Sequence, residues 1–437
     1  GSSSLFFPVL AGNFMAMSTE SAAATAAAAQ TEKLASQDPV QRRAAAERLG
    51  GLGLAALPFA TSLARLLASD SDWRVRAAAA EALGQVARVA GATPALSPCR
   101  RELTGGLTDP EWPVRVAVAE TLVELAEDET GRDDKDVIAY RAALVARLED
   151  EHHDVRRATS QALVAVGGPV VELVIPYLRC ARAESRRESA DVLCKLSFRW
   201  PEQSKEAAIP LASCLRDPDG SVRSAAAAAL GQLGSAAADA VACYADDDDE
   251  DAKLRAVEIL GVLGPASRSQ GPVLARLLRD DDCDVRKAAA EALGEQGPAA
   301  SAYAQELASC LRDEDEDVCC AAAAALGVLG PAAAPFAAEL AACMGKGQGR
   351  IPEVVAEALT NAGEAASVHI AGCLGDPRAE VRRAAAHALG RLGSCAAVRI
   401  SELSAALRLP KRLVSSVLRS LSQVRKGLCI ACRMPVP

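Results

Sequence analysis

Apolar residues recur along the chain at helical spacing, in pairs of short segments separated by an acidic turn. In GPVLARLLRD (271–280), aliphatic residues follow Pro272 at the spacing of one helix face, which predicts a helix that starts near this proline. A second helix is predicted from Val285 to a closing Gly294, with Asp280–Asp284 as the turn between the two. The pattern therefore predicts an antiparallel helix pair.

This helix pair repeats along the whole chain. Its most regular element is an Ala-Leu-Gly motif near the end of the second helix, whose leucine recurs every 30 to 41 residues. The aligned leucines are Leu49, Leu83, Leu122, Leu163, Leu193, Leu230, Leu260, Leu293, Leu326, Leu359, Leu389 and Leu421. A period in this range is typical of a helical solenoid. The sequence thus predicts an all-α solenoid of about twelve repeats over residues 31–425.

The remaining segments are predicted to lie outside the regular repeats. Residues 1–30 form a low-complexity N-terminal tail, and residues 426–437 form a C-terminal tail. No Lys or Arg precedes Lys33, so the N-terminal segment fits neither a secretory signal nor a mitochondrial presequence. The two longest spacings indicate insertions at 91–103 and 127–137, which we expect to project as loops.

Charged residues recur around the turn of each repeat. An acid or serine directly before the valine position is predicted to cap the second helix, at Asp154, Ser221, Asp251, Asp284 and Asp317. A further Asp lies four residues earlier in most repeats, and a base follows the valine position. These bases include Arg76, Arg115, Arg156, Arg223, Arg286 and Arg382. Since they recur at the repeat period, we interpret acid and base as a structural ladder between neighbouring repeats.

The pattern DPxxxVRxxAAxALGxLG resembles the HEAT repeat, in the short form of roughly 30 residues that also occurs in phycobilisome-lyase-like proteins. The resemblance extends over about residues 36–425. It implies a right-handed superhelix of helix pairs, with the second helices on the concave side and a protein-binding scaffold as the function. The tenth repeat, GKGQGRIPEVVAEALTNAG, departs from the pattern because it lacks the recurrent Asp and has Pro352 in place of the base.

Composition narrows the function further. The net charge of −9 opposes non-specific binding to nucleic acid, which depends on Lys and Arg. Only 3% of the residues are aromatic, so bulky anchors for a large ligand pocket are few. No apolar run has the length expected of a membrane span. We therefore expect neither a nucleic-acid partner nor a membrane span.

Candidate chemistry is sparse. Cys214, Cys310, Cys343 and Cys373 share one repeat position that is elsewhere leucine, which indicates buried apolar packing and reduced thiols. The CIAC at Cys429–Cys432 lacks a second ligand pair, and the Asp246–Asp251 run lacks the spacing of an EF-hand. No His-Glu pair, GxSxG, P-loop or Rossmann fingerprint is present. We predict no catalytic residue, no metal site and no cofactor.

One repeating feature goes beyond what the fold requires. Six residues after the valine position, on the exposed side of the second helix, most repeats carry an acid, whereas one of the last carries His387. We call the acids at this position the acidic line: Glu47, Glu81, Glu120, Asp191, Glu258, Glu291 and Glu357. Arg43, Arg187 and Lys287 precede three of them by four residues, so part of this charge is expected to pair within the helix.

The acidic line favours a partner protein that bears a basic segment. We interpret the chain as a non-catalytic scaffold or assembly subunit of a larger complex, in the cytoplasm or else inside a plastid or another organelle. The alternative is a phycobilin lyase or isomerase subunit acting on a phycobiliprotein, since short HEAT-like repeats also occur there. The acidic line could also be no more than a solvated surface.

Overall fold

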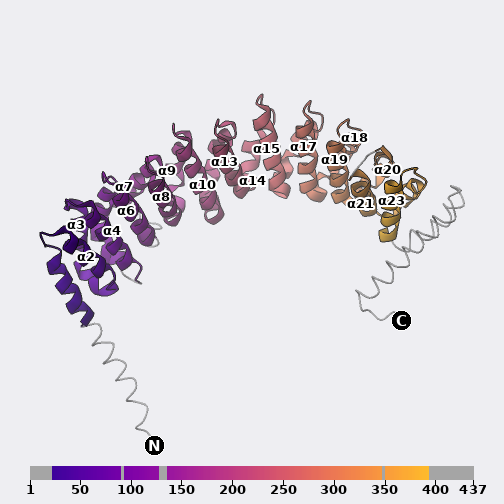
Figure 1. The fold of residues 1–437 in the computed structure, drawn as a ribbon. Helices are drawn as coiled ribbons and strands as arrows, with labels where there is room; N and C mark the ends of the chain where they lie inside the picture. The colour runs from indigo at the N-terminus through magenta and orange to yellow at the C-terminus, as the bar shows by residue number, and fades with distance from the viewer. Residues whose placement is uncertain (1–21, 90–92, 127–134, 347–349, 393–437) are drawn as a thin grey trace, which may run out of the picture. The chain divides into compact units, whose positions relative to one another are not determined.

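The computed structural model describes residues 22–89, 93–126, 135–346 and 350–392 (Figure 1). Within these ranges all regular secondary structure is α-helix or 3-10 helix. Residues 22–33 are helical and precede the first complete helix pair. The twelfth aligned leucine, Leu421, the CIAC cysteines and the segment 347–349 lie outside the described residues.

The second helices of the repeats are the longest elements, and each contains one aligned leucine. In chain order they are α2 (Pro39–Gly50), α4 (Trp73–Ala87), α6 (Trp112–Leu125), α8 (His153–Val166), α10 (Ala183–Arg199), α13 (Gly220–Leu233), α15 (Glu250–Leu263), α17 (Cys283–Glu295), α19 (Glu316–Leu329), α21 (Ile351–Asn361) and α23 (Ala379–Leu392). We call the exposed side of these helices that carries the acidic line the second-helix face.

The first helices are shorter. They are α3 (Ala60–Ser69), α5 (Arg100–Gly106), α7 (Lys135–Val145), α9 (Val171–Val174), α11 (Pro201–Ser204), α12 (Ala208–Ser213), α14 (Ser235–Ala242), α16 (Gly271–Leu277), α18 (Ala304–Cys310), α20 (Ala337–Lys346) and α22 (Ser367–Cys373). Several follow a 3-10 segment that begins at a Gly-Pro pair, such as Gly264–Gln270, Gly297–Tyr303 and Gly330–Phe336. Proline suits these starts because its missing N–H would be unpaired there in any case.

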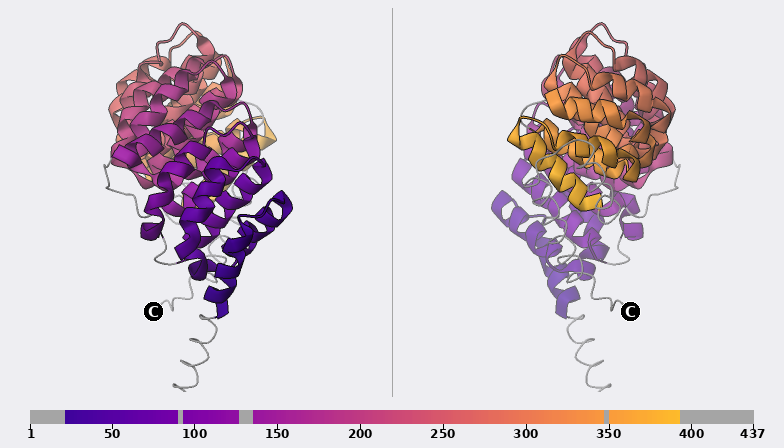
Figure 2. Two further views of the ribbon diagram at one scale, coloured as in Figure 1. Left: turned by 90° about the vertical axis from the view of Figure 1, so that its left-hand side faces the viewer. Right: turned by 90° about the vertical axis from the view of Figure 1, so that its right-hand side faces the viewer.

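The chain divides into two compact units, Gly1–Leu233 and Gly234–Pro437. In the N-terminal unit, α2, α4, α6, α8, α10 and α13 contact one another in sequence, while α3, α5 and α7 form a second row. In the C-terminal unit, α15, α17, α19, α21 and α23 form the equivalent row. Figure 2 shows the first helix pairs of the N-terminal unit nearest the viewer on the left, and the last helix pairs of the C-terminal unit nearest the viewer on the right. Each unit is thus a stack of helix pairs in two layers, as an α-solenoid requires.

The core consists of the aligned leucines and the alanines beside them. The aligned leucines within the described residues are at most 1% exposed. The glycine after the leucine lets neighbouring second helices approach closely: a Cβ on Gly327 would lie 3.1 Å from the Cα of Ala358. Gly294 and Ala325 repeat this contact at 3.2 Å. Gly294 therefore serves helix packing.

The predicted helix ends were wrong by a few residues. The observed N-caps lie two residues before the predicted ones: His152 caps α8, and acids cap others, such as Asp282, whose carboxylate accepts a hydrogen bond from the Asp284 N–H at 2.8 Å. Asp284 itself lies in the first turn. Similarly, α17 ends at Glu295 and the left-handed glycine is Gly297, with φ 64°. The acidic run is nevertheless structural, since its side chains start the helix.

The insertion at 91–103 was wrongly predicted as a loop. From Thr93 onward it forms the 3-10 segment Thr93–Cys99 and the start of α5. Its apolar residues Leu96, Cys99 and Leu103 are buried, so the segment is the first layer of its repeat. Its two prolines interrupt α-helix but fit the 3-10 turn. Of the second insertion, residues 127–134 lie outside the described residues.

One segment qualifies the expectation about membrane spans. Among the described residues, Glu316–Gly345 has the length and hydropathy of a candidate span, and 56% of its apolar window is buried inside the protein. This segment comprises α19, a 3-10 turn and most of α20, with Gly330 in a left-handed conformation between them. Its apolar side chains include Leu326 and Leu340, both at 0% exposure in the repeat core. Its hydropathy is that of a core helix pair.

Candidate functional site

Arginines of the second helices bind aspartates of the following repeat. Arg115 Nε and Nη2 donate to Asp150 Oδ2 and Oδ1 at 2.8 and 2.9 Å. Its Nη1 donates to the carbonyl oxygens of Asp109 and Pro110 in its own turn. The same bidentate pairing joins Arg42 to Asp70, Arg76 to Asp109, Arg186 to Asp217 and Arg286 to Asp313. Each arginine therefore ties the turn of its own repeat to the next repeat.

Three aspartates of this ladder, Asp70, Asp217 and Asp313, stay ionised in spite of burial. Burial alone would raise the pKa of Asp70, Asp217 and Asp313. Hydrogen bonds from the arginine and from the backbone N–H two residues on outweigh it, so each pKa is lowered below its ordinary value. The ladder thus contributes to stability at neutral pH.

The other predicted ladder bases make no described contact with a carboxylate of the next repeat. They donate hydrogen bonds to backbone carbonyl groups of their own turn. Arg156 donates to the carbonyl oxygens of Asp150 and Glu151, while its Nε has no partner. In the next repeat, Cys180 occupies the position of the acid. Burial, and to a smaller extent its hydrogen bond to Glu149, raise the pKa of the Cys180 thiol to about 12. Arg223 and Arg382 likewise donate to carbonyl groups of their own turns.

The ladder changes at the tenth repeat. Cys319 replaces the base of the ninth repeat, and position 346 of the tenth repeat is Lys where others have Asp. The base and its acid are therefore lost together. One repeat later, Arg378 Nε contacts Asp376 Oδ1 at 3.3 Å and its Nη2 donates to the Met344 carbonyl at 3.0 Å. A different arginine thus joins these two repeats.

The acidic line lies on the exposed side of the second helices. All its members are exposed except Asp191, which is half-buried. Glu81, Glu120, Glu258 and Glu291 make no ion pair with any described residue. Of the three predicted pairs within a helix, only Arg43 with Glu47 forms, at 2.7 Å. Arg187 instead contacts Glu188, and Lys287 contacts Asp317 of the next repeat, because those carboxylates lie nearer.

Nearby carboxylates in the N-terminal unit, on neighbouring helices or on the same one, act on one another. Partial burial, and then the charges of Glu120 and Glu47, raise the pKa of Glu81. Partial burial, and then Glu188, raise the pKa of Asp191. The negative charge of Glu81 and of Asp191 is therefore slightly unfavourable in the folded protein. Exposure to solvent weakens this effect.

A groove of about 340 Å³ lies between α21 and α23 on the same face. Glu353 and Glu357 of α21 line one side, and Arg383, His387 and Arg391 of α23 line the other. Only Glu357 was predicted from the sequence as a site residue. Thr360 also lines the groove and takes the place of the glycine in the Ala-Leu-Gly motif, as Val123, Val164 and Cys194 do in α6, α8 and α10.

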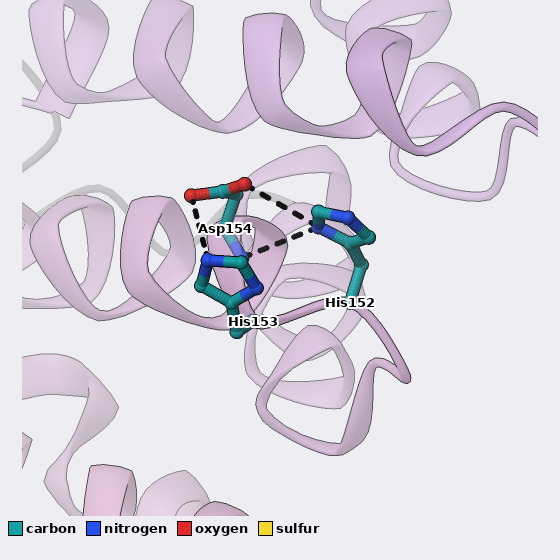
Figure 3. A group of neighbouring side chains, drawn as sticks. All are labelled: His152, His153 and Asp154. Atoms are coloured by element: carbon teal, nitrogen blue, oxygen red, sulfur yellow. Dashed lines mark hydrogen bonds and ion pairs between the residues drawn. The ribbon is translucent and has the colours of Figure 1, made fainter.

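His152, His153 and Asp154 form the one group among the described residues that could hold a metal ion, with ligand atoms within 4.8 Å of one another (Figure 3). However, His152 Nδ1 accepts a hydrogen bond from the Asp154 N–H and caps α8. The His152 ring also stacks on Trp112 at 3.9 Å, and Arg157 lies 3.6 Å from the Asp154 carboxylate. A cation would compete with these contacts at the positive end of a helix, so we interpret the group as a helix start.

The cysteines that share one repeat position behave as apolar residues. Cys214, Cys310 and Cys343 are buried and Cys373 is half-buried, and none of the described cysteines forms a disulfide. Burial raises the pKa of Cys214 and of Cys310 to about 11. Such thiols are poor nucleophiles.

Comparison with protein families decides the classification. Models described as HEAT repeats match residues 171–261 and 270–360, and a model described as HEAT repeat matches 61–90, 101–128 and 369–396. The chain is a HEAT-repeat protein. The family and the two-layered helix pairs together confirm the all-α solenoid predicted from the sequence. The number of repeats stays a prediction, since the twelfth falls outside the described residues.

Solved structures of karyopherins share the fold of this HEAT-repeat protein. A Kap121p mutant is 15% identical with a TM-score of 0.60, over 99% of this chain and 51% of that chain. Importin beta is 14% identical with a TM-score of 0.56, over 92% of this chain and 65% of that chain. Kap121p bound to the extreme C-terminus of the phosphatase Cdc14p is 14% identical with a TM-score of 0.51, over 94% and 54%. The comparison with curated proteins gives no match.

Proposed function

We propose that this HEAT-repeat protein is a non-catalytic scaffold that holds a partner protein on its second-helix face, through contacts between the acidic line and a basic segment of the partner. The observation that carries the proposal is the unpaired charge of this face. Glu258 and Glu291 lie on adjacent helices, α15 and α17, and are exposed without an ion pair to any described residue. By contrast, the ladder aspartates are paired with arginines.

The electrostatics support the proposal. Partial burial and the neighbouring carboxylates raise the pKa of Glu81, so a neutral residue there would suit the fold better. Charge that opposes folding is common at binding surfaces, because selection for binding offsets the cost in stability. A basic segment laid along the face would remove this repulsion. Binding of that kind acts chiefly on the association rate and weakens as salt rises.

The fold also suits such a partner. Kap121p, which has the same fold, has been crystallised with the extreme C-terminus of Cdc14p, so a stack of HEAT repeats can hold a segment of another protein. The repeats offer many similar positions along one face, which is useful for a long segment. We therefore expect membership in a larger complex.

The test is a charge reversal in the C-terminal unit. Partners captured from the source cell by the parent protein are identified by mass spectrometry, and association rates are then measured at low and high salt. Glu258→Lys with Glu291→Lys should slow association about tenfold at low salt, and less at high salt. The matched control is Asp281→Lys with Glu314→Lys, which changes the charge equally at exposed turn residues and should bind like the parent.

Two outcomes would contradict the proposal. If the reversal at 258 and 291 binds as fast as the parent at low salt, the acidic line is only a solvated surface. If the parent instead produces a visible absorbance band when mixed with a bilin and an apophycobiliprotein, the protein is a lyase subunit.

A further inference from the structure

We propose that the groove between α21 and α23 sets the register of the bound partner segment. The groove binds the junction between a basic stretch of that segment and an acidic stretch that adjoins it. The inference rests on the proposed function, since it concerns the same face of the C-terminal unit. The inference adds a site that recognises acidic side chains. The partner segment is then expected to contain one basic block and one acidic block.

The charge of the second-helix face reverses at this groove. The exposed side of α15 and α17 carries Glu258 and Glu291. The α21 side of the groove continues this acidity with Glu353 and Glu357, whereas the α23 side is basic, with Arg383, His387 and Arg391. A uniformly basic segment would therefore be attracted as far as α21 and repelled at α23.

The charges that line the groove are available for a partner. Arg391 lies 3.4 Å from Glu357, and Arg383 lies 3.8 Å from Glu353. All four side chains are exposed, and exposed pairs of this kind contribute little to stability. A partner can therefore exchange these contacts for its own, with its carboxylates on the arginines and its ammonium or guanidinium groups on the glutamates.

One residue distinguishes α21 from the other second helices of the C-terminal unit. In α15, α17 and α19 the aligned leucine is followed by glycine, whose missing Cβ lets the next helix approach: a Cβ on Gly261 would lie 3.4 Å from the Cα of Ala292. At the same position α21 has Thr360, which faces the groove together with Ala388 of α23. Its hydroxyl donates to the Ala356 carbonyl at 2.7 Å. The threonine side chain therefore stands where α15, α17 and α19 have no side chain, beside Ala388 in the groove.

The size and lining of the groove suit part of a peptide. A volume of about 340 Å³ is at the lower end for small-ligand pockets and accommodates a few side chains. Its floor includes Ala356, Ala384 and Ala388, which are buried alanines that offer an apolar contact. The expected segment thus places Lys or Arg over α15 to α21, a small apolar residue on this floor and Asp or Glu beside α23.

The experiment uses two kinds of fluorescent peptide, each of about 12 residues, since four helix spacings of ~10 Å match that length of extended chain. One peptide has a Lys/Ala block joined to a Glu/Ala block, made in both orders, and the other has Lys/Ala throughout. Fluorescence anisotropy with the full chain should show about three- to tenfold tighter binding of the better block peptide. Arg383→Glu with Arg391→Glu should reverse this preference. Arg279→Glu with Arg312→Glu is the matched control at exposed turn residues and should leave the preference unchanged.

Variants at position 360 test the groove without altering charge. Thr360→Gly should let α23 approach α21 and reduce the affinity for the block peptide, whereas Thr360→Val keeps the bulk and should bind like the parent. Circular dichroism checks that each variant is folded. The inference is overturned if the parent binds the all-Lys peptide as tightly as the block peptide. If the charge reversal at 258 and 291 still weakens binding in that case, the proposed function remains supported without the groove. Failure of the folded parent to bind either peptide would count against both.

Discussion

The arginines of the ladder differ in the contacts that would be lost on substitution. Arg115 and Asp150 are both nearly inaccessible, so removing the arginine leaves the buried carboxylate with only the His152 N–H at 3.0 Å and Arg147 at 3.7 Å. Arg156 occupies the equivalent position one repeat on and is similarly buried, but it faces a repeat that has Cys180 in the acid position. The two arginines therefore form a natural comparison between a complete and an incomplete ladder step.

We predict that Arg115→Leu is clearly more destabilising than Arg156→Leu. Breaking the buried pair should cost about 3 kcal/mol or more, and losing only the bonds from Arg156 to carbonyl groups about 1 to 2 kcal/mol. Urea unfolding followed by circular dichroism measures the two midpoints. Equal midpoints would show that the carboxylate contributes nothing to this step.

Ladder carboxylates also set the response to acid. The pKa values of Asp70, Asp217 and Asp313 are lower in the folded protein than the ordinary value of about 3.9. Their stabilising contribution is therefore complete above that value and disappears as pH falls through the lowered folded pKa. Glu81 and Asp191 act in the opposite sense, because their raised pKa values favour the folded state slightly as they become protonated.

We predict that the thermal midpoint is nearly constant from pH 7 to about pH 5 and falls steeply below about pH 4. The variant Arg186→Leu with Asp217→Leu should show a shallower decline, since one ladder step no longer titrates. A midpoint that rises on acidification below pH 4 would contradict this assignment of charges.

At the scale of the helices, α15, α17 and α19 pack closely on their next neighbours through the glycine after the aligned leucine. A side chain on Gly327 would meet the backbone of Ala358 in α21, whereas a Cβ on Gly372 in α22 would meet nothing within 4 Å. Both glycines lie within helices and neither has a positive φ. They differ only in the neighbour that a side chain would encounter.

Gly327→Val should therefore destabilise the protein by about 1 to 3 kcal/mol through overpacking, whereas Gly372→Ala should stabilise it by about 0.5 to 1 kcal/mol through helix propensity. Thermal melts of the two variants against the parent measure these shifts. A neutral Gly327→Val would mean that α19 and α21 can separate freely, and the explanation given for the Thr360 groove would lose its basis.

Sequence patterns predicted the helices better than their ends and contacts. The aligned leucines identified the second helices because a leucine at a constant position must be buried in each repeat. The caps were misplaced by two residues, since several acids in succession can each accept a hydrogen bond from a backbone N–H. The prolines of 91–103 suggested a loop, although a 3-10 segment accommodates them. The groove depended on which residues of two helices face each other, and this register is not visible in one sequence.

At the scale of the whole molecule, stability should be spread over neighbour contacts. Each unit is built from contacts between consecutive helix pairs, and no single centre holds either of them together. We predict that a fragment of residues 234–437 keeps the helical content expected for its length. Far-ultraviolet circular dichroism of this fragment measures it, and a nearly complete loss of helix would indicate one cooperative globule instead of a repeat stack.

The central claim is that partner protein binds on the second-helix face, and site-specific crosslinking tests it most directly. A photo-crosslinking amino acid is placed at position 258 or 291 on this face, and at Arg276 or Gln305 of the first helices as controls. The account predicts crosslinks to a basic segment of the partner from 258 and 291, reduced by high salt, and few from 276 and 305. Crosslinks chiefly from 276 and 305 would show that the partner occupies the opposite layer and would contradict the account.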